Sequence, residues 1–267
     1  MRAVTPPADP APIASDPPDR PAGGEAVLRG RGIGRRPGGD PGSAWIWREL
    51  ELALAPGELV TVRGATGAGK TLLLRSLAQL DPLDEGELAL LGRPASEWPA
   101  TGWRRRVAYL HQTPVLLPGT VEENLRELFR WKEHEDRSYD RRAVLDRLEP
   151  LGRGRAWLER DAGDLSGGER QILALLRTLG AEPSVLLLDE PTAALDPAAT
   201  GRLETLVRGW LDAGEGAPRA VLWVTHDARQ ARRVGGRRLV LEAGRLRPEA
   251  EAAGAPGTSP AGGEEGG

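Results

Sequence analysis

The octet GATGAGKT, residues 64 to 71, has the residue types and the spacing of a phosphate-binding loop. Glycine lets backbone N–H groups turn inward onto phosphate oxygens, and the start of a helix adds partial positive charge. A lysine in this position reaches the β- and γ-phosphates of a nucleotide, and a hydroxyl beside it ligates Mg²⁺. The octet therefore predicts a nucleotide site formed by Gly64, Ala65, Thr66, Gly67, Ala68, Gly69, Lys70 and Thr71.

The alternative is a glycine-rich turn, because 35 of the 267 residues are Gly. The chain's own residue frequencies give roughly 0.003 expected matches to G-x4-G-K-[ST]. Only two of its 36 cationic residues are Lys, and one of them is Lys70. The octet also follows a predicted strand and opens a predicted helix, which is the setting that a P-loop requires. These observations favour the phosphate site, and residues 64–71 are called the P-loop below.

Two carboxylates follow a continuous apolar run in SVLLLDE, residues 184 to 190. Asp189 at the end of such a strand is placed to hold Mg²⁺ opposite the phosphates. Glu190 beside it is placed to polarise the attacking water as a general base. Taken alone, the pair also fits two acids that end a strand where it meets solvent.

The heptapeptide LSGGERQ, residues 165 to 171 and called the signature below, lies before a predicted apolar-faced helix. Ser166, Gly167 and Gly168 there make a second hydroxyl-plus-amide anion site at a helix N-terminus. The heptapeptide resembles the signature motif of the ATP-binding cassette (ABC) ATPases. The resemblance implies a head-to-tail dimer, in which each ATP lies between the P-loop of one subunit and the signature of the other.

Three further residues match elements of that family in the expected order. Gln112 follows RVAYLH and resembles the glutamine that contacts Mg²⁺ or the attacking water. Asp196 ends AALD, which resembles the loop that reaches across the dimer, and it also fits a helix cap before Pro197. His226 ends VLWVTH, 37 residues after Asp189, and resembles the histidine that contacts the γ-phosphate.

Buried strands that alternate with helices must position these residues. Apolar runs at 58–64, 106–112, 184–190 and 220–227 indicate strands, and segments 69–80, 139–149, 167–180 and 195–211 indicate helices. A further helix is expected to open at Thr120, with Glu123 completing a capping box. Such alternation predicts a largely parallel sheet covered on both faces. The resemblance implies an α/β P-loop NTPase with a RecA-like, mostly parallel core sheet, an antiparallel β subdomain and a small helical subdomain.

The expected cassette spans residues 25 to 247, with its helical subdomain at about 113–164. Residues 1–24 and 248–267 are rich in Pro, Ala and Gly and are predicted to be disordered. The family usually stacks adenine on an aromatic near the end of the first strand. This chain has Arg35 and Arg36 there, so we expect Arg35 or Trp45 to cover the adenine.

The composition limits the partners. The net charge of −3 argues against a protein held to nucleic acid by bulk charge, and no apolar run reaches the roughly 18 residues that span a bilayer. The N-terminus has Pro where a signal peptide is apolar, so we expect a cytoplasmic protein. The resemblance then implies ATP and Mg²⁺ as ligands and a separate membrane permease that holds the dimer at the cytoplasmic face of the membrane.

TPVLLPGTVEENL, residues 113 to 125, resembles the permease-facing stretch of transporter subunits, although a surface loop and a capped helix fit it as well. The QTP, GTVxxNL and VLWVTHD stretches also resemble short bacterial subunits of iron or metal export. Another substrate, or a non-transport ABC ATPase of DNA repair or translation, is the alternative. The non-transport class usually shows a long coiled-coil insertion, Cys pairs or two cassettes, and this chain has none of them.

Overall fold

Two sheets form the framework of the computed structural model, which describes residues 25–130, 138–214 and 217–249. The first sheet is antiparallel, with the strand order β2-β1-β4-β5. The second has the order β10-β9-β3-β8-β7-β6, is parallel from β9 to β6, and ends in the antiparallel strand β10. The strands are β1 Leu28–Arg35, β2 Trp47–Leu54, β3 Leu59–Arg63, β4 Glu85–Leu90, β5 Arg93–Pro94, β6 Val107–Leu110, β7 Val185–Asp189, β8 Ala220–Val224, β9 Arg237–Glu242 and β10 Arg245–Pro248.

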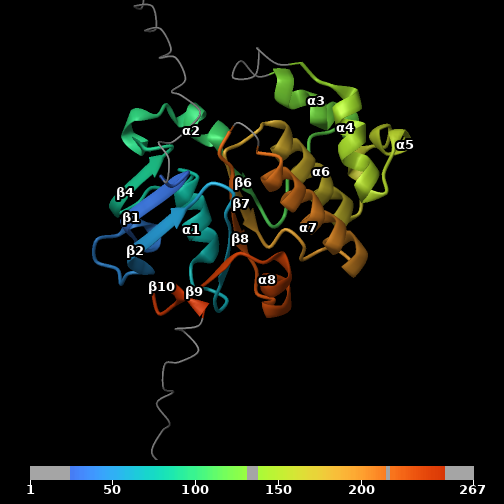
Figure 1. Cartoon of the computed structure of the whole chain (residues 1–267). Coiled ribbons are helices and arrows are strands. Elements are labelled where there is room, and N and C mark those ends of the chain that lie inside the picture. The colour runs from blue at the N-terminus through green and yellow to red at the C-terminus, as the bar shows by residue number, and fades with distance from the viewer. Residues whose placement is uncertain (1–24, 131–137, 215–216, 250–267) are drawn as a thin grey trace, which may run out of the picture.

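The antiparallel sheet lies on one side of the parallel sheet, and helices α3 to α5 lie on the other, beyond α6 and α7 (Figure 1). The helices are α1 Lys70–Leu77, α2 Ala100–Arg106, α3 Val121–Arg126, α4 Arg141–Leu148, α5 Arg155–Leu158, α6 Gly167–Gly180, α7 Pro197–Asp212 and α8 Ala228–Val234. Side-chain caps fix several starts, because an N-cap oxygen satisfies a free N–H of the first turn. Thr120 and Glu123 form the predicted capping box of α3, and Asp196 caps α7 through the N–H of Ala199.

The parallel sheet separates two apolar clusters. Every residue of β7 and of β8 is buried. Successive side chains of a strand point to opposite faces, so each strand supplies both clusters. In β7, Val185 and Leu187 pack toward α1 and the antiparallel sheet, whereas Leu186 and Leu188 pack toward α6 and α7. A third cluster joins α3, α4 and α5 to α6.

This architecture confirms the predicted fold class, with its mostly parallel core sheet and antiparallel β subdomain. The predicted end of the cassette at residue 247 is two residues too early. Pro248 lies in β10, and the Glu249 carboxylate accepts hydrogen bonds at 2.6 Å from both Arg63 and Arg238. The prediction of disorder for 1–24, and for 250–267, concerns residues outside the described ranges.

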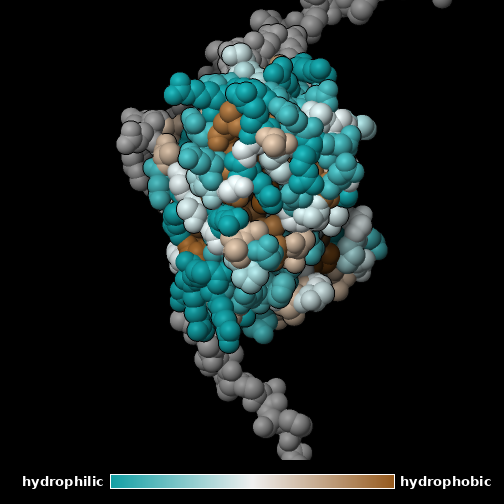
Figure 2. All heavy atoms as spheres, turned by 90° about the vertical axis from the view of Figure 1, so that its right-hand side faces the viewer, coloured by the Kyte–Doolittle hydropathy of each residue, from teal (hydrophilic) through white to brown (hydrophobic). Residues whose placement is uncertain are grey.

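The surface that carries α4, α5 and α7 is mostly hydrophilic, with apolar side chains only in small patches (Figure 2). Among the described residues, none of the helices combines the length and the apolar character needed to cross a bilayer.

Candidate nucleotide site

The P-loop joins the end of β3 to the start of α1, and close backbone packing requires its glycines. A Cβ on Gly64 would collide with the carbonyl oxygen of Leu241 in β9. Gly69 has φ +90°, and a Cβ there would lie 2.7 Å from Ile46 Cγ2. Side chains rarely adopt such a φ, so only glycine fits this turn without strain. The loop therefore keeps the tight turn that phosphate binding needs.

The Lys70 ammonium lies within the P-loop, against two of its backbone carbonyls. Its Nζ donates hydrogen bonds of 2.8 Å to the carbonyl oxygens of Gly64 and Ala65. The residue is only 9% exposed, so the charge lies within the loop rather than in bulk solvent. A compact ammonium with three donors is the cationic group that fits between two converging carbonyls.

A hydroxyl and a carboxylate meet beside the lysine, and they belong to the two residues expected to hold Mg²⁺. Thr71 Oγ1 donates to Asp189 Oδ2 at 2.8 Å, which joins the first turn of α1 to the end of β7. The Tyr109 hydroxyl of β6 donates to the same oxygen at 3.0 Å. Burial and the charge of Asp189 raise the pKa of Tyr109, so this phenol stays protonated and donates. Oxygen ligands of this kind fit Mg²⁺, which binds through one or two protein groups together with phosphates.

A cavity of about 470 Å³ opens beside this cluster, with walls that include Gly67, Gly69, Lys70, Gln112, Asp189 and Glu190. Glu190 also lines a neighbouring cavity of about 440 Å³, which His226 lines as well. His226 Nδ1 lies 3.1 Å from Glu190 Oε2. One chain therefore brings together the P-loop, Gln112, the carboxylates of Asp189 and Glu190, and His226.

The signature residues lie elsewhere. Ser166 caps α6 in a capping box with Glu169, and a Cβ on Gly168 would come within 2.8 Å of Leu195 Cδ2. The signature thus packs on the loop that ends at Asp196. The residues that wall the P-loop cavity do not include Ser166, Gly167, Gly168 or Asp196.

The two expected adenine platforms differ in their surroundings. Arg35 is 8% exposed, and its guanidinium pairs with Asp84 at 3.1 Å. The Arg35 side chain is already covered by the protein and leaves little of its face for an adenine, so the Arg35 alternative is disfavoured. Trp45 remains a candidate. It is half-buried beside Ile46, which lines the P-loop cavity, and the Arg36 guanidinium lies 3.9 Å from its ring centroid.

Three polar residues of this region did not figure in the sequence prediction: Tyr109, Thr192 and Gln230. Tyr109 bonds to Asp189, and Thr192 and Gln230 join the segments that follow β7 and β8. The sequence carries a feature that could have indicated two of these three residues. Tyr109 lies three residues before Gln112 in a buried strand, and Gln230 lies four residues after His226 at the start of a helix.

Comparison with known proteins agrees with this geometry. The family model described as ABC transporter matches residues 47–193. A probable anion import ATP-binding protein of Haloferax volcanii is 37% identical over 245 residues, which cover 85% of this chain and 82% of that protein. The probable iron export ATP-binding protein FetA of Escherichia coli is 36% identical over 186 residues, covering 70% of this chain and 80% of FetA.

The fold has matches among solved structures. The dimeric ABC transporter cassette MJ0796 superposes with a TM-score of 0.69 and 23% identity, covering 82% of this chain and 96% of that one. This likeness shows the fold, and the family match and the relatives show the family. The chain belongs to the ABC transporter family, as one of its ATP-binding, ATP-hydrolysing subunits.

Proposed function

We propose that this chain hydrolyses ATP in a head-to-tail dimer and thereby powers a separate membrane permease. The observation that carries the proposal is the split of the anion-binding elements. The P-loop, Asp189, Glu190 and His226 surround one pair of cavities, whereas Ser166 and its glycines stand apart at the start of α6. A second subunit would bring its signature to the phosphates held by the first.

In this proposal the P-loop binds the phosphates and the cluster beside it binds the metal. The backbone N–H groups of the loop and the Lys70 ammonium hold the β- and γ-phosphates. Thr71 and Asp189 hold Mg²⁺, with Gln112 as a further ligand of the metal or of the attacking water. Bound there, Mg²⁺ neutralises charge on the phosphate oxygens. Tyr109 keeps the Asp189 carboxylate oriented, as outer-sphere partners of metal ligands do.

Glu190 is the proposed general base, and His226 its partner at the γ-phosphate. A base must lie within hydrogen-bond reach of the water that it activates. Glu190 lines the P-loop cavity and is hydrogen-bonded to His226, so it lies between the histidine and the cavity in which we propose that the phosphates bind. Ser166, Gly167 and Gly168 would complete the site of the opposite subunit, and Asp196 would reach across the interface.

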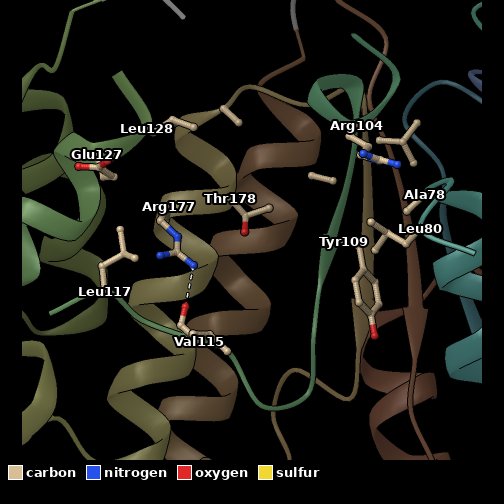
Figure 3. Close-up of a pocket in the computed structure, with 13 residues that line it drawn as sticks. Ala78, Leu80, Arg104, Tyr109, Val115, Leu117, Glu127, Leu128, Arg177 and Thr178 are labelled. Atoms are coloured by element: carbon tan, nitrogen blue, oxygen red, sulfur yellow. Dashed lines mark hydrogen bonds between the residues drawn. The ribbon is translucent and has the colours of Figure 1, made fainter. Parts of the chain in front are cut away.

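The permease has a candidate docking groove. A cavity of about 540 Å³ lies between β6 and the end of α1 on one side and α6 on the other (Figure 3). Val115, Leu117 and Leu80 line it and are 79%, 42% and 42% exposed. Arg177 points into the groove from α6 and donates to the Val115 carbonyl, which fixes the loop (Figure 3). An amphipathic helix at the cytoplasmic side of a permease suits such a groove.

If the permease docks in this groove, negative charges introduced there should weaken its binding. Val115→Glu combined with Leu117→Glu should weaken capture of the permease from native membranes by roughly 30-fold, or about 2 kcal/mol, because docking would have to strip water from two carboxylates placed where apolar side chains make the contact. Tagged chain and solubilised membranes are mixed, and the captured membrane protein is quantified by mass spectrometry.

Thr205→Glu is the matched control, since it adds a carboxylate to an exposed position on α7, outside the groove. It should capture the permease as the unaltered chain does. Equal capture by the doubly substituted chain would place the permease elsewhere. Failure of the unaltered chain to capture any membrane protein would favour the non-transport alternative.

We propose that the transported substrate is a metal ion and that it is exported, which the similarity to FetA supports. Anion import is the second candidate, because the Haloferax volcanii relative is named for it and matches a larger share of this chain. The permease selects the substrate, so the captured complex decides between them. Its ATPase rate is compared in the presence of iron salts and of sulfate, phosphate or sulfonate.

A further inference from the structure

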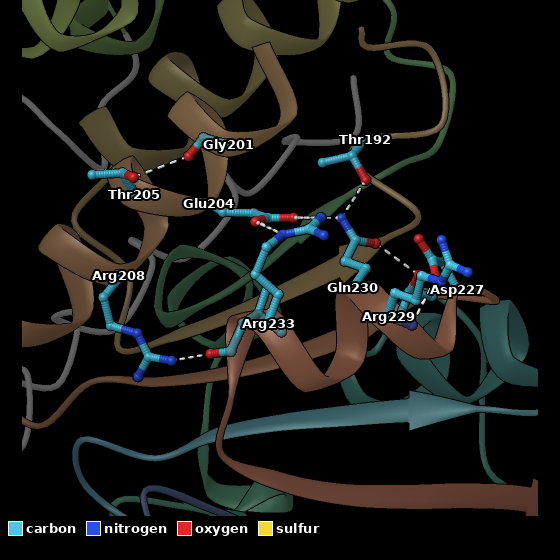
Figure 4. A network of polar contacts seen from close by, with 11 residues as sticks. Thr192, Gly201, Glu204, Thr205, Arg208, Asp227, Arg229, Gln230 and Arg233 are labelled. Atoms are coloured by element: carbon cyan, nitrogen blue, oxygen red, sulfur yellow. Dashed lines mark hydrogen bonds and ion pairs between the residues drawn. The ribbon is translucent and has the colours of Figure 1, made fainter. Parts of the chain in front are cut away.

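A buried amide links the segments that carry Glu190 and His226. Gln230 of α8 is only 4% exposed, and all three of its contacts are short (Figure 4). Its Nε2 donates to Thr192 Oγ1 at 2.7 Å and to Glu204 Oε1 of α7 at 2.9 Å. Its Oε1 accepts from Thr225 Oγ1 at 2.7 Å. The amide uses both donors and its acceptor.

The orientation of this amide is determined by its surroundings. Arg233 binds both oxygens of the Glu204 carboxylate at 2.7 Å. A carboxylate held by a guanidinium accepts hydrogen bonds only, so the NH₂ of Gln230 must face it. The carbonyl oxygen of Gln230 therefore faces Thr225, whose hydroxyl donates to it. That hydroxyl in turn accepts from the N–H of Asp227 at 3.1 Å.

The two threonines are close in sequence to the proposed catalytic groups. Thr225 directly precedes His226, and Thr192 follows Glu190 by two residues. The His226 side chain is 71% exposed, so little packing holds it in place. Its neighbour Thr225 is buried and anchored to Gln230. Thr192 also accepts the N–H of Leu195 at its carbonyl oxygen, in the loop that leads to Asp196.

We propose that Gln230 is a positioning residue, which holds His226 at hydrogen-bonding distance from Glu190 by joining the two segments through one amide. It touches no nucleotide and acts through Thr225 and Thr192. Because Thr192 begins the loop that ends at Asp196, the same amide connects His226 to the face where a second subunit would dock. This inference rests on the roles proposed above for Glu190 and His226.

Gln230→Met tests the proposal, because methionine keeps the length of the side chain and removes all three hydrogen bonds. We expect kcat for ATP hydrolysis to fall about tenfold or more, with KM for ATP within about twofold of the starting value, since a misplaced catalytic group slows the chemistry and leaves nucleotide binding intact. Thr225→Val removes the same link from the other end and should give a similar loss.

A double-mutant cycle separates positioning from a merely structural role. In a His226→Ala background, Gln230→Met should change kcat less than about twofold, because the group that it positions is already gone. Arg208→Met is the matched control. Arg208 also links α7 to α8, through the Val234 carbonyl one turn farther from the site (Figure 4), and its loss should leave kcat unchanged.

Other outcomes overturn the inference. An unchanged kcat in Gln230→Met with a lowered melting temperature would make the amide a structural link only, and an equal loss in both backgrounds would exclude His226 as its target. If His226→Ala itself keeps full turnover, the proposed role of His226 fails and this inference falls with it. If His226→Ala loses turnover and Gln230→Met does not, only this inference falls.

Discussion

Glu190→Gln should lower kcat for ATP hydrolysis by about 10²-fold or more and leave ATP binding nearly intact. The amide keeps the shape of the side chain but is not basic enough to take the proton of water. Lys70, Thr71 and Asp189, which hold the phosphates and the metal in our proposal, are untouched. The bound nucleotide should therefore persist, and the dimer that it closes should accumulate.

Steady-state phosphate release gives the kcat, and light scattering with and without MgATP gives the mass of the particle. Glu87→Gln is the matched control, because Glu87 is an exposed carboxylate of β4 outside both site cavities. It should keep both the rate and the nucleotide response of the original chain. Full turnover by the Glu190→Gln protein would contradict our assignment of the base.

Lys70→Met should weaken ATP binding by roughly 10- to 150-fold, because a hydrogen bond to a charged group contributes about 1.5–3 kcal/mol. The ammonium lies between the carbonyls of Gly64 and Ala65, and Lys70 is the one cationic residue in the octet GATGAGKT. In a homodimer every subunit carries this substitution, and both composite sites lose their phosphate contact. Titration calorimetry with MgATP measures the loss.

Lys70→Arg separates charge from shape. The guanidinium keeps the positive charge but is planar and larger, and the converging carbonyls suit a compact ammonium. We expect it to bind ATP little better than Lys70→Met does, although arginine is the usual cation of this chain. Undiminished ATP affinity in Lys70→Met would remove the lysine from the phosphate site.

The elements that could be predicted from the sequence are those whose signals lie in adjacent residues. The run from Val185 to Leu188 is apolar without interruption, as a strand buried on both faces requires, and the two carboxylates that follow mark the end of the strand. The cap at Asp196 followed by Pro197 predicts the start of α7. The glycines of the P-loop together with Lys70 predict the start of α1. In each case the residues that form the structure are neighbours in the chain.

The rest depends on contacts between distant segments. The β9–β10 hairpin is absent from the sequence prediction. Its first strand, RRLVLE, opens with two arginines, its second, RLRP, ends in proline, and its turn is Ala243-Gly244 rather than Asn-Gly. The contact of Tyr109 with Asp189 joins residues 80 positions apart. Similarly, the burial of Arg35, beside a partner 49 positions away at Asp84, disfavours it as the adenine platform. No local pattern predicts such partners.

The claim that each ATP site is shared by two subunits has one direct test. Lys70→Met removes the ammonium from the half of the site that the P-loop supplies. Gly167→Asp places a carboxylate against the phosphates in the half that the signature supplies. A Cβ at Gly167 fits, because its nearest neighbour is Ala194 Cβ at 3.6 Å. Each variant alone should be inactive, since every site of its homodimer contains one damaged half.

The measurement is the ATPase rate of the two inactive proteins mixed in equal amounts. A mixed dimer pairs the intact P-loop of one subunit with the intact signature of the other, so one of its two sites is whole. Half of the dimers are mixed, and we expect the activity to recover to about a quarter of the unaltered rate. A mixture that stays as inactive as its components would show that the site lies within a single subunit.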